Sequence, residues 1–301
     1  MKVKVISVLE DNYMYLVIEE NTREAIAVDA TVPKRLLEIV KKEEVKLTTI
    51  LTTHHHWDHS RGNEELVQLC PGLRVYGADE RICALTHKLT HNQELKFGAI
   101  WVRCLLTPGH TLGHMCYFMW EDNCPDAPAV FSGDALFIGG CGRLLEGTAE
   151  QMYRSLNETL GTLPKETKVF CGHEYTVRNL KFALKVEPDN ETVKTKLAWA
   201  KARDDDDIPT VPSTLGEEFH YNPFLRVVYH HVKDNPVRVR GRRDADEACT
   251  AVFLTIIIQK SSAFLGHVFQ DVTKNLPRLV KPDYYLLLVN DMAKIILPEE
   301  I

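Results

Sequence analysis

The amino-acid sequence predicts an α/β protein in which helices cover β-sheets, followed by a smaller helical region. Two observations carry this prediction: up to about residue 171 strand-like segments alternate with amphipathic helical segments, and from residue 176 onward the strong patterns are helical. The chain has 301 residues, of which 45% are hydrophobic and 26% are charged. This length and composition are typical of a globular protein with one large α/β domain and a second, smaller one.

The first part of the chain begins with strand patterns that are interrupted by one clear helix. Asp11-Asn12 is a natural turn pair between the first two strands. Pro33 is a favourable first residue for a helix, and the KRLLEIVKKEE segment after it places apolar residues at helical spacing. A second helix is expected at 63–69. Strands are expected at 2–9, 13–19, 24–29, 46–53 and 73–77.

The following part repeats this style up to residue 171 and then changes. Strands are expected at 94–106, 114–120, 129–133 and 167–171, with one helix at 149–160. The segments TVRNLKFALKVE and ETVKTKLAWAKARD are typical of helices, and no strand pattern of comparable quality separates them. We therefore expect a first domain over 1–174, a helical domain over 175–226 and a tail over 227–301.

The overall charge and the cysteines argue against several classes of protein. A formal net charge of −6 disfavours a general nucleic-acid binder, which needs a basic face to neutralise phosphates. No apolar run approaches the ~20 residues that cross a bilayer, and the N-terminus is typical of a strand rather than of a targeting peptide. The eight cysteines are scattered without a C-x-x-C pair, which favours a reducing compartment. We expect a cytoplasmic monomer without membrane or nucleic-acid partners.

The most informative segment is Thr-His-His-His-Trp-Asp-His, directly after a β-branched strand. Ligand sites in α/β sheets gather where strands end, and imidazole together with carboxylate suits zinc, iron or manganese. His54 and His56 are two positions apart, so in an extended chain both point to one side, while His55 points the other way and is left out. Asp58 and His59 continue the turn and can face a second ion. A plain polar loop is the alternative interpretation, but H-x-H-x-D-H after an apolar strand favours a metal site.

Three further polar residues each follow a predicted strand. His110 ends the segment LLTPGH, Asp134 ends VFSGD and His173 ends VFCGH. A glycine precedes each of them, which suits the crowding of backbone around a small ion. One such residue alone would be weak evidence, but three strand ends of this kind beside the histidine cluster indicate a common site.

Together these segments give seven candidate metal ligands: His54, His56, Asp58, His59, His110, Asp134 and His173. A single zinc ion takes about four ligands, so this set suits two ions that share a bridging carboxylate. We assign that bridge to Asp134. The expected cofactor is a pair of metal ions per chain, Zn²⁺ in the first place, with Fe or Mn as alternatives.

These segments, in this order, resemble the metallo-β-lactamase superfamily, and within it glyoxalase II (hydroxyacylglutathione hydrolase). The likeness rests on THHHWDH, GHTLGH, SGD and CGHEY, and it extends through TVPSTL and YNPF to about residue 226. The resemblance implies a four-layer αββα sandwich as the catalytic domain over 1–174 and a helical substrate-binding domain over 175–226. It also implies one metal ion on His54, His56 and His110, a second on Asp58, His59 and His173, and contact of both with Asp134.

The resemblance further implies a reaction. The usual substrate of the family is S-D-lactoylglutathione, which is split to D-lactate and glutathione. A hydroxide that bridges two metal ions would attack the thioester carbonyl, with Asp58 and Asp134 as the catalytic carboxylates. The expected partner is therefore a small-molecule thioester, a glutathione conjugate.

Two parts of the sequence depart from the pattern of the family. Its glutathione pocket includes a GCGKFY-like loop that reads GCGRLL here, so Arg143 keeps a positive charge whereas Leu145 lacks the hydroxyl of a tyrosine. Tyr175 is retained, and we predict that Arg143 and Tyr175 bind substrate. The family continues into a short helical end with basic residues, whereas this chain runs through a divergent tail over 227–301.

Two alternatives stay open at the level of the sequence. A mononuclear iron dioxygenase that acts on glutathione persulfide shares much of the motif, and a metal content of about one iron per chain would identify it. A metal-binding paralogue whose hydrolase activity is lost, or altered towards general esters, is the other alternative. The change at Leu145 and the divergent tail motivate this second alternative.

Overall fold

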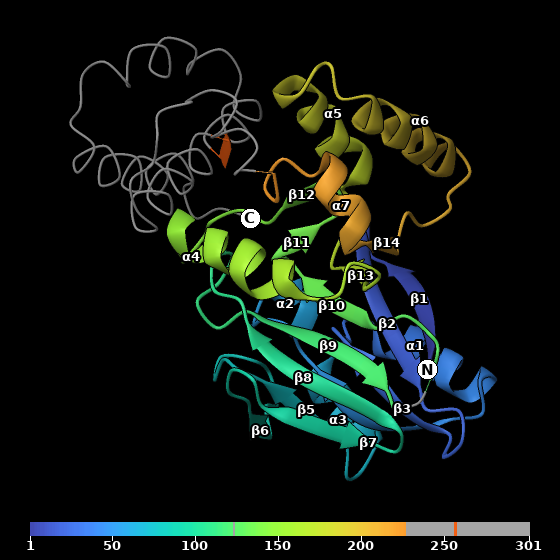
Figure 1. Ribbon diagram of the computed structural model, residues 1–301. Coiled ribbons are helices and arrows are strands. Elements are labelled where there is room, and N and C mark those ends of the chain that lie inside the picture. The colour runs from blue at the N-terminus through green and yellow to red at the C-terminus, as the bar shows by residue number, and fades with distance from the viewer. Residues whose placement is uncertain (123, 227–255, 258–301) are drawn as a thin grey trace.

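The computed structural model describes residues 1–122, 124–226 and 256–257 (Figure 1). Its centre is a pair of six-stranded sheets that pack face to face. The first sheet has the order β1-β2-β3-β4-β5-β6. Its strands are β1 (Lys2–Val8), β2 (Asn12–Ile18), β3 (Glu24–Val28), β4 (Lys46–Leu51), β5 (Arg74–Gly77) and β6 (His87–Lys88). The first three strands are antiparallel, and β3 to β6 run parallel to one another.

The second sheet has the order β14-β13-β10-β9-β8-β7. Its strands are β7 (Glu94–Phe97), β8 (Ile100–Leu106), β9 (Met115–Glu121), β10 (Ala129–Gly133), β13 (Lys168–Cys171) and β14 (Ser213–Thr214). A small hairpin of β11 (Leu136–Phe137) and β12 (Gly140–Cys141) follows β10. Only the β10–β13 pair of the second sheet is parallel, so the carboxyl ends of these two strands lie at the same edge.

The core between the sheets follows from the two-residue period of the strands. Along β9, Met115, Tyr117 and Met119 are buried in the core between the sheets, whereas Cys116 is buried in the cluster on the outer face. From the first sheet, the Tyr15 ring packs edge-on against Phe131 of β10, with ring centroids 5.2 Å apart. Because apolar residues lie on both faces of each sheet, helices must cover the outer faces to bury them.

Helices cover both outer faces, as the sequence predicts. On the first sheet, Leu36 of α1 (Pro33–Lys42) and Leu66 of α3 (Asn63–Leu69) share an apolar cluster with Leu16 and Ile50. On the second sheet, Met152 of α4 (Ala149–Tyr153) packs with residues of β9, β10 and β13. The helix–sheet–sheet–helix order confirms the predicted αββα sandwich.

The structure corrects the sequence prediction in two elements. The strand expected at 94–106 is a hairpin of β7 and β8, because the chain reverses at Gly98, whose φ of +56° is a conformation that favours glycine. The helix expected at 149–160 is α-helical only as far as Tyr153. A π-helix (Arg154–Thr159) and a 3₁₀ turn (Leu160–Thr162) continue it.

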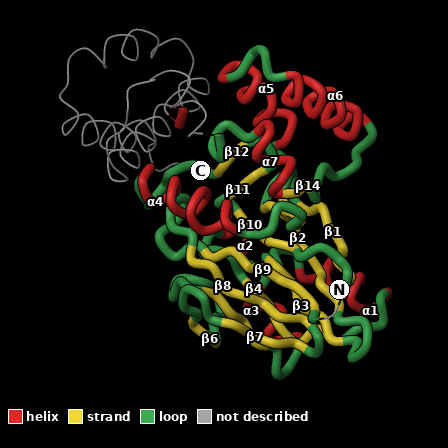
Figure 2. The backbone as a smooth tube through the Cα atoms, viewed as in Figure 1, coloured by secondary structure: helices red, strands yellow, loops and turns green. Residues whose placement is uncertain are grey.

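The helical region comprises α5 (Thr176–Val186), α6 (Glu191–Asp205) and α7 (Leu215–Tyr221). Helices α5 and α6 lie side by side at one end of the sandwich (Figure 2). The Asn190 side chain accepts hydrogen bonds from the first turn of α6, and Thr214 with Glu217 forms a capping box on α7. Before α7 the chain returns to the second sheet, where β14 pairs with β13. Apart from 256–257, the tail expected over 227–301 lies outside the described residues.

Glu218 of α7 ties the helical region to the β11–β12 hairpin. Its buried carboxylate accepts hydrogen bonds from Ser213 Oγ (2.6 Å), the Tyr221 hydroxyl (2.8 Å), the Gly139 backbone N–H (2.9 Å) and Asn222 Nδ2 (3.0 Å). Asn222 Nδ2 also donates to the carbonyls of Phe137 and Gly140. These bonds hold the hairpin that leads into the GCGRLL loop. Within the described part of the chain, no helix is long and apolar enough to span a membrane.

Candidate metal centre

Three imidazole nitrogens meet beyond the end of β4. After Leu51 the chain leaves the sheet, and the short helix α2 (Trp57–Ser60) begins at Trp57. His54 Nε2 lies 3.0 Å from His56 Nδ1, which in turn lies 3.0 Å from His110 Nε2. His54 is fully buried, and His110 arrives from the loop after β8. The fold therefore brings His110, which is distant in the sequence, next to His54 and His56, and the ring nitrogens of these three residues lie close together.

A second group forms beside the first. His59 Nε2 lies 3.1 Å from His173 Nε2, and Asp58 Oδ2 lies 3.4 Å from the former and 3.3 Å from the latter. Asp58 and His59 are both in the first turn of α2, whereas His173 follows β13. The Asp58 side chain is 31% exposed, more than its two histidine neighbours, so this group opens to solvent on the side of Asp58.

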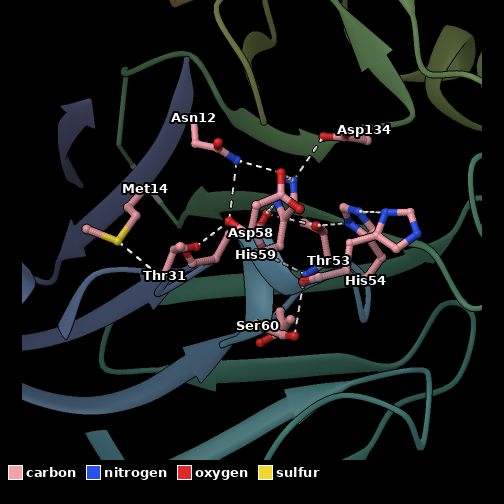
Figure 3. Close-up of polar contacts among 12 residues, drawn as sticks. Asn12, Met14, Thr31, Thr53, His54, Asp58, His59, Ser60 and Asp134 are labelled. Atoms are coloured by element: carbon pink, nitrogen blue, oxygen red, sulfur yellow. Dashed lines mark hydrogen bonds and ion pairs between the residues drawn. The ribbon is translucent and has the colours of Figure 1, made fainter. Parts of the chain in front are cut away.

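Asp134 lies between the two groups. Its Oδ2 is 3.6 Å from His110 Nε2 and 3.4 Å from His173 Nε2, and its Oδ1 is 3.4 Å from His59 Nε2. Figure 3 shows Asp134 and Asp58 directed toward His59, and Asn12 directed toward Asp58. The structure therefore brings all seven candidate ligands of the sequence analysis into one cluster, in the grouping that the resemblance implies.

Hydrogen bonds on the far side of the rings fix which nitrogen faces the cluster. His59 Nδ1 donates to Asp29 Oδ2 at 2.9 Å, and His173 Nδ1 donates to Asp11 Oδ1 at 2.8 Å. His110 Nδ1 donates to the backbone carbonyl of Arg143 at 2.9 Å. With Nδ1 as the donor, Nε2 is the nitrogen of each ring that faces the cluster, and its lone pair can bind a metal ion when the ring is neutral. Such partners raise the affinity of a metal site by orienting its ligands.

The sequence analysis missed the orienting carboxylates. Asp29 directly follows β3, as Asp134 follows β10, so its position after a strand is a signal that could have found it. Asp11 belongs to the turn between β1 and β2, and nothing in its local sequence points to His173, 162 residues away.

His114 is a further buried histidine that the sequence analysis did not assign. Its Nδ1 donates to Thr107 Oγ1 at 2.9 Å, and its Nε2 accepts the backbone N–H of Asp134 at 3.1 Å. Burial lowers the pKa of His114 to about 3, so the ring is a neutral acceptor at physiological pH. It positions the backbone of Asp134 and offers no nitrogen to the cluster.

Two glycines allow this close packing. A side chain at Gly172 would collide with Asp134 Oδ1 and with the ring of His59. Gly133 has a φ of +46°, and a Cβ there would lie 2.6 Å from Thr53 Oγ1. The crowding that the sequence analysis expected next to Asp134 and His173 is therefore present at both of these glycines.

Charge differs between the two groups. Burial is the main reason why the pKa values of His54 and His110 are lowered and that of His56 falls to about 4, so these rings are neutral. Burial also opposes a charge on His59, but Asp134 and Asp29 beside it raise its pKa to about 10. In the same way, Asp134 and Asp11 raise the pKa of His173 well above its usual value. A cation bound here would displace the protons of these two rings.

The cluster fits metal ions by distance and by chemistry. Nitrogens about 2.0–2.1 Å from a tetrahedral zinc ion lie about 3.3–3.4 Å from one another, close to the separations in both groups. Each group contains three side chains whose ligand atoms lie within 4.8 Å of one another. Asp134 Oδ1 is buried and accepts no hydrogen bond from the described residues, an arrangement that a cation would satisfy.

The other residues singled out by the sequence lie around the cluster. The Tyr175 ring stacks on His173, with ring centroids 4.8 Å apart and an angle of 4° between the planes. The Arg143 side chain is exposed, next to the carbonyl that orients His110. His55 faces Asp79 and Glu146, each 3.6 Å away, and does not belong to either group of ligands. All seven described cysteines are free.

Comparison with known families places the two parts of the chain. Residues 10–173 match the family model of the metallo-beta-lactamase superfamily. Residues 174–256 match the family model named hydroxyacylglutathione hydrolase C-terminus. The first match includes all seven candidate ligands, and the second includes Tyr175.

Individual proteins give the same picture. A hydroxyacylglutathione hydrolase-like protein of Gallus gallus is 73% identical over 252 residues, which cover 84% of this chain and 88% of that protein. The cytoplasmic hydroxyacylglutathione hydrolase of Arabidopsis thaliana is 48% identical over 229 residues, or 75% of this chain and 88% of that protein. A crystal structure of ETHE1 from Myxococcus xanthus has a TM-score of 0.58 and 27% identity, and covers 84% of this chain and 98% of its own.

Proposed function

The chain belongs to the hydroxyacylglutathione hydrolase family of the metallo-beta-lactamase superfamily, and from this premise we infer that it hydrolyses a glutathione thioester. The products are a carboxylic acid and glutathione, with S-D-lactoylglutathione as the expected substrate. The chain is therefore a metal-dependent hydrolase in the glyoxalase II class.

One observation carries this proposal: two groups of three ligand atoms converge, with the Asp134 carboxylate between them. We propose that His54, His56 and His110 hold one metal ion, that Asp58, His59 and His173 hold another, and that Asp134 contacts both. Zinc is the ion that the mixed imidazole and carboxylate set suits first, with iron or manganese as alternatives.

Bound metal ions would lower the pKa of a water molecule that they hold, and they would polarise the thioester carbonyl. The chain itself orients the reactants. Asp58, whose side chain is partly exposed, and the buried Asp134 both lie beside His59 and would direct the attacking water. Asn12 Nδ2 donates to Asp58 Oδ2 at 2.9 Å and limits the rotation of that carboxylate. A thiolate leaves readily, so no separate acid is required beside the site.

Arg143 and Tyr175 are the proposed contacts of the glutathione part. The Arg143 guanidinium can pair with a carboxylate of glutathione, and its backbone already orients His110. The Tyr175 ring stacks on the ring of His173, one of the proposed metal ligands. We propose that 1–174 is the catalytic domain and that 175–226 provides the substrate-binding helices.

We also propose that the protein acts as a monomer in the cytoplasm. The Arabidopsis thaliana relative is named as a cytoplasmic hydroxyacylglutathione hydrolase. Because this chain belongs to the same family, that name supports a cytoplasmic location for it. A small-molecule thioester is the one partner that the reaction requires.

The test measures metal content and turnover on the same preparation. Full-length protein is loaded with zinc, metal per chain is measured by inductively coupled plasma mass spectrometry, and hydrolysis of S-D-lactoylglutathione is followed by the loss of thioester absorbance. His54→Ala serves as the blank, because it removes one proposed ligand at a buried position. About two metal ions per chain and turnover that disappears in the blank support the proposal.

Two results would overturn it. Fully metallated protein that leaves S-D-lactoylglutathione and other glutathione thioesters intact would contradict the hydrolase assignment. About one iron per chain, with oxygen uptake on glutathione persulfide in place of hydrolysis, would identify the dioxygenase alternative.

A further inference from the structure

Three charged side chains outside the two groups of ligands form one ion-pair network. Arg81 Nη1 lies 2.6 Å from Glu146 Oε1, and Arg81 Nη2 lies 2.9 Å from Glu146 Oε2 and 2.7 Å from Asp79 Oδ2. Arg81 Nε also donates to Asp79 Oδ1 at 3.0 Å. We call Asp79, Arg81 and Glu146 the charged clamp. A guanidinium that is bound in this two-pronged way fixes the direction as well as the distance of its partners.

Glu146 of the clamp holds the chain around His110. Its Oε2 accepts the backbone N–H of Leu112 at 2.8 Å, and its own backbone N–H donates to the His110 carbonyl at 3.3 Å. In the same segment as Glu146, the carbonyl of Arg143 accepts His110 Nδ1 at 2.9 Å. This segment therefore contacts both the backbone and the ring of a candidate ligand, and the clamp fixes the segment at Glu146.

Asp79 approaches the loop of His110 from the first sheet. It follows β5, which pairs in parallel with β4, so it leaves the sheet at the edge where the chain continues to His54 and His56. A Cβ at Gly113 would lie 2.6 Å from Asp79 Oδ2, so this carboxylate packs against the backbone of the His110 loop. Asp79 therefore connects the edge of the first sheet with that loop.

His55 lies between the two carboxylates of the clamp. Its Nδ1 is 3.6 Å from Asp79 Oδ2, and its Nε2 is 3.6 Å from Glu146 Oε1. In the chain, His55 stands between two of the candidate ligands. The clamp therefore contacts both segments that supply the first group of ligands, at His55 in one segment and around His110 in the other.

Exposure limits what the clamp contributes to overall stability. Hydrogen bonds from Arg81 are the main reason why the pKa values of Asp79 and Glu146 are lowered, so both carboxylates are ionised at physiological pH. The Arg81 side chain is 52% exposed, and an exposed ion pair contributes little to the free energy of unfolding. Loss of the clamp should therefore change where the two segments lie more than whether the chain folds.

We propose that the charged clamp positions the three-histidine group, which consists of His54, His56 and His110, and thereby raises the affinity of this group for a metal ion. This inference depends on the proposed function, because it uses the pair of metal ions assigned there. Among the described residues, no atom of the clamp belongs to a group of candidate ligands. The clamp acts on the ion through the segments that carry the three histidines.

The second group of ligands should not depend on the clamp. His59 and His173 have orienting carboxylates of their own, Asp29 and Asp11. Within the part of the chain that the structure describes, the clamp makes no hydrogen bond or ion pair with Asp58, His59 or His173. Removal of the clamp should therefore weaken one metal ion and leave the other unchanged.

The experiment measures the affinity of each metal ion in full-length protein. Zinc is titrated in competition with a chromophoric chelator, which gives two dissociation constants for a chain that holds two ions. The variants are Glu146→Gln, Arg81→Gln and the double variant, because glutamine removes the charge and keeps a polar side chain. Each single variant should weaken one ion by about tenfold, since the clamp holds the ligand segments rather than a ligand ring. The double variant should weaken that ion no further, because the pair acts as a unit.

A second substitution shows which ion the clamp affects. Asp11→Asn removes the carboxylate that accepts His173 Nδ1, so it should weaken the ion of the second group. Combined with Glu146→Gln, it should leave both ions weakened, each as much as in the corresponding single variant. If Glu146 acted on the same ion as Asp11, one ion would keep its native affinity in the combined variant, and the proposal would be overturned.

Arg103→Gln is the matched control. Arg103 Nη2 lies 2.9 Å from Glu94 Oε1 in the β7–β8 hairpin, and the two side chains are 42% and 41% exposed. This variant removes an exposed pair of the same kind outside the segments that carry the ligands, so both ions should keep their native affinity. Urea unfolding of the metal-free proteins should give one midpoint for the native chain, Arg103→Gln and Glu146→Gln.

The outcomes separate this inference from the proposed function. Native affinity for both ions in Glu146→Gln and Arg81→Gln overturns the role of the clamp alone. Equal weakening of both ions, or a urea midpoint lowered only in the clamp variants, also overturns it, because the clamp would then support the fold as a whole. Native protein that binds no metal ion overturns the proposed function, and the inference with it. Two bound ions without hydrolysis of any glutathione thioester contradict the proposed reaction alone. Weakening of one ion, distinct from the ion that Asp11→Asn weakens and absent from Arg103→Gln, supports the proposal.

Discussion

Asp29 Oδ2 lies 2.9 Å from Nδ1 of His59, and both side chains are buried behind the metal cluster. Asp29 also accepts the backbone N–H and the hydroxyl of Thr53, each at 2.8 Å. One carboxylate therefore fixes the direction of His59 and holds the residue that precedes His54. Asp29 does not face the cluster of candidate ligands, so it can affect a bound ion only through His59 and Thr53.

Replacing this carboxylate tests that relationship. We expect Asp29→Asn to weaken metal binding by about 10- to 100-fold, because the amide removes the negative charge behind His59. The measurement is a competition titration against a chromophoric chelator, with Asp126→Asn on the exposed loop before β10 as the control. An affinity equal to that of the native chain would show that Asp29 only packs behind the site.

Asp134→Ala tests the bridging role directly. Its oxygens lie 3.4–3.6 Å from nitrogens of His59, His110 and His173, so its removal takes one ligand from each proposed ion. We expect at most one tightly held metal ion per chain and a loss of kcat of at least about 100-fold. Metal per chain after dialysis is the measurement, and an unchanged stoichiometry would refute the bridge.

Much of this site could be predicted because its ligands are local to strand ends. One apolar strand is followed at once by His54, His56, Asp58 and His59, and these residue types at such short spacing already indicate a metal site. The π-helical turn after Tyr153 and the hairpin at Gly98 could not be predicted, because packing and one backbone reversal decide them.

Contacts between distant segments account for the rest of what the sequence did not show. The Asp11–His173 hydrogen bond joins a turn at the N-terminus to the end of β13, and the Glu218–Gly139 bond joins α7 to the β11–β12 hairpin. Each depends on the relative placement of two elements. Periodicity along the chain describes one element at a time and holds no information on such pairs.

Leu145→Tyr tests whether residue 145 lines the substrate pocket. Tyrosine adds a hydroxyl next to the loop of His110, and one hydrogen bond to a glutathione thioester is worth ~1 kcal/mol. We therefore expect KM for S-D-lactoylglutathione to fall about fivefold with little change in kcat, the result of uniform binding. Leu145→Phe is the control, since it adds the ring without the hydroxyl. A KM that does not fall in the tyrosine variant would place residue 145 outside the pocket.

We expect Glu218→Ala to be among the most destabilising single substitutions of a buried residue. The change removes a buried acceptor and takes away the hydrogen bonds that Ser213, Tyr221 and Gly139 donate to it, whereas Asn222 keeps its bonds to two backbone carbonyls. We expect the free energy of unfolding to fall by ~3 kcal/mol or more. Urea unfolding followed by circular dichroism measures it. Glu191→Ala, which removes an exposed ion pair with Lys194, should change the stability by less than ~1 kcal/mol.

The free energy of unfolding should also depend on pH through Glu218. Burial raises the pKa of Glu218 above that of an exposed carboxyl, although its four hydrogen bonds oppose this effect. A carboxyl with a raised pKa in the folded state contributes stability that is fully present below its unfolded pKa of ~4.3 and is lost as the pH rises through the folded pKa. Glutamine at position 218 keeps the size of the side chain and does not titrate.

The native chain should therefore lose stability relative to Glu218→Gln as the pH rises from about 4.5. The measurement is urea unfolding of both zinc-loaded proteins at a series of pH values, with the difference in the free energy of unfolding plotted against pH. The metal cluster and the other carboxylates titrate alike in both proteins and cancel in this difference. A difference that is flat, or that favours the native chain increasingly at higher pH, would show that Glu218 is ionised in the folded protein as readily as in the unfolded chain, or more readily.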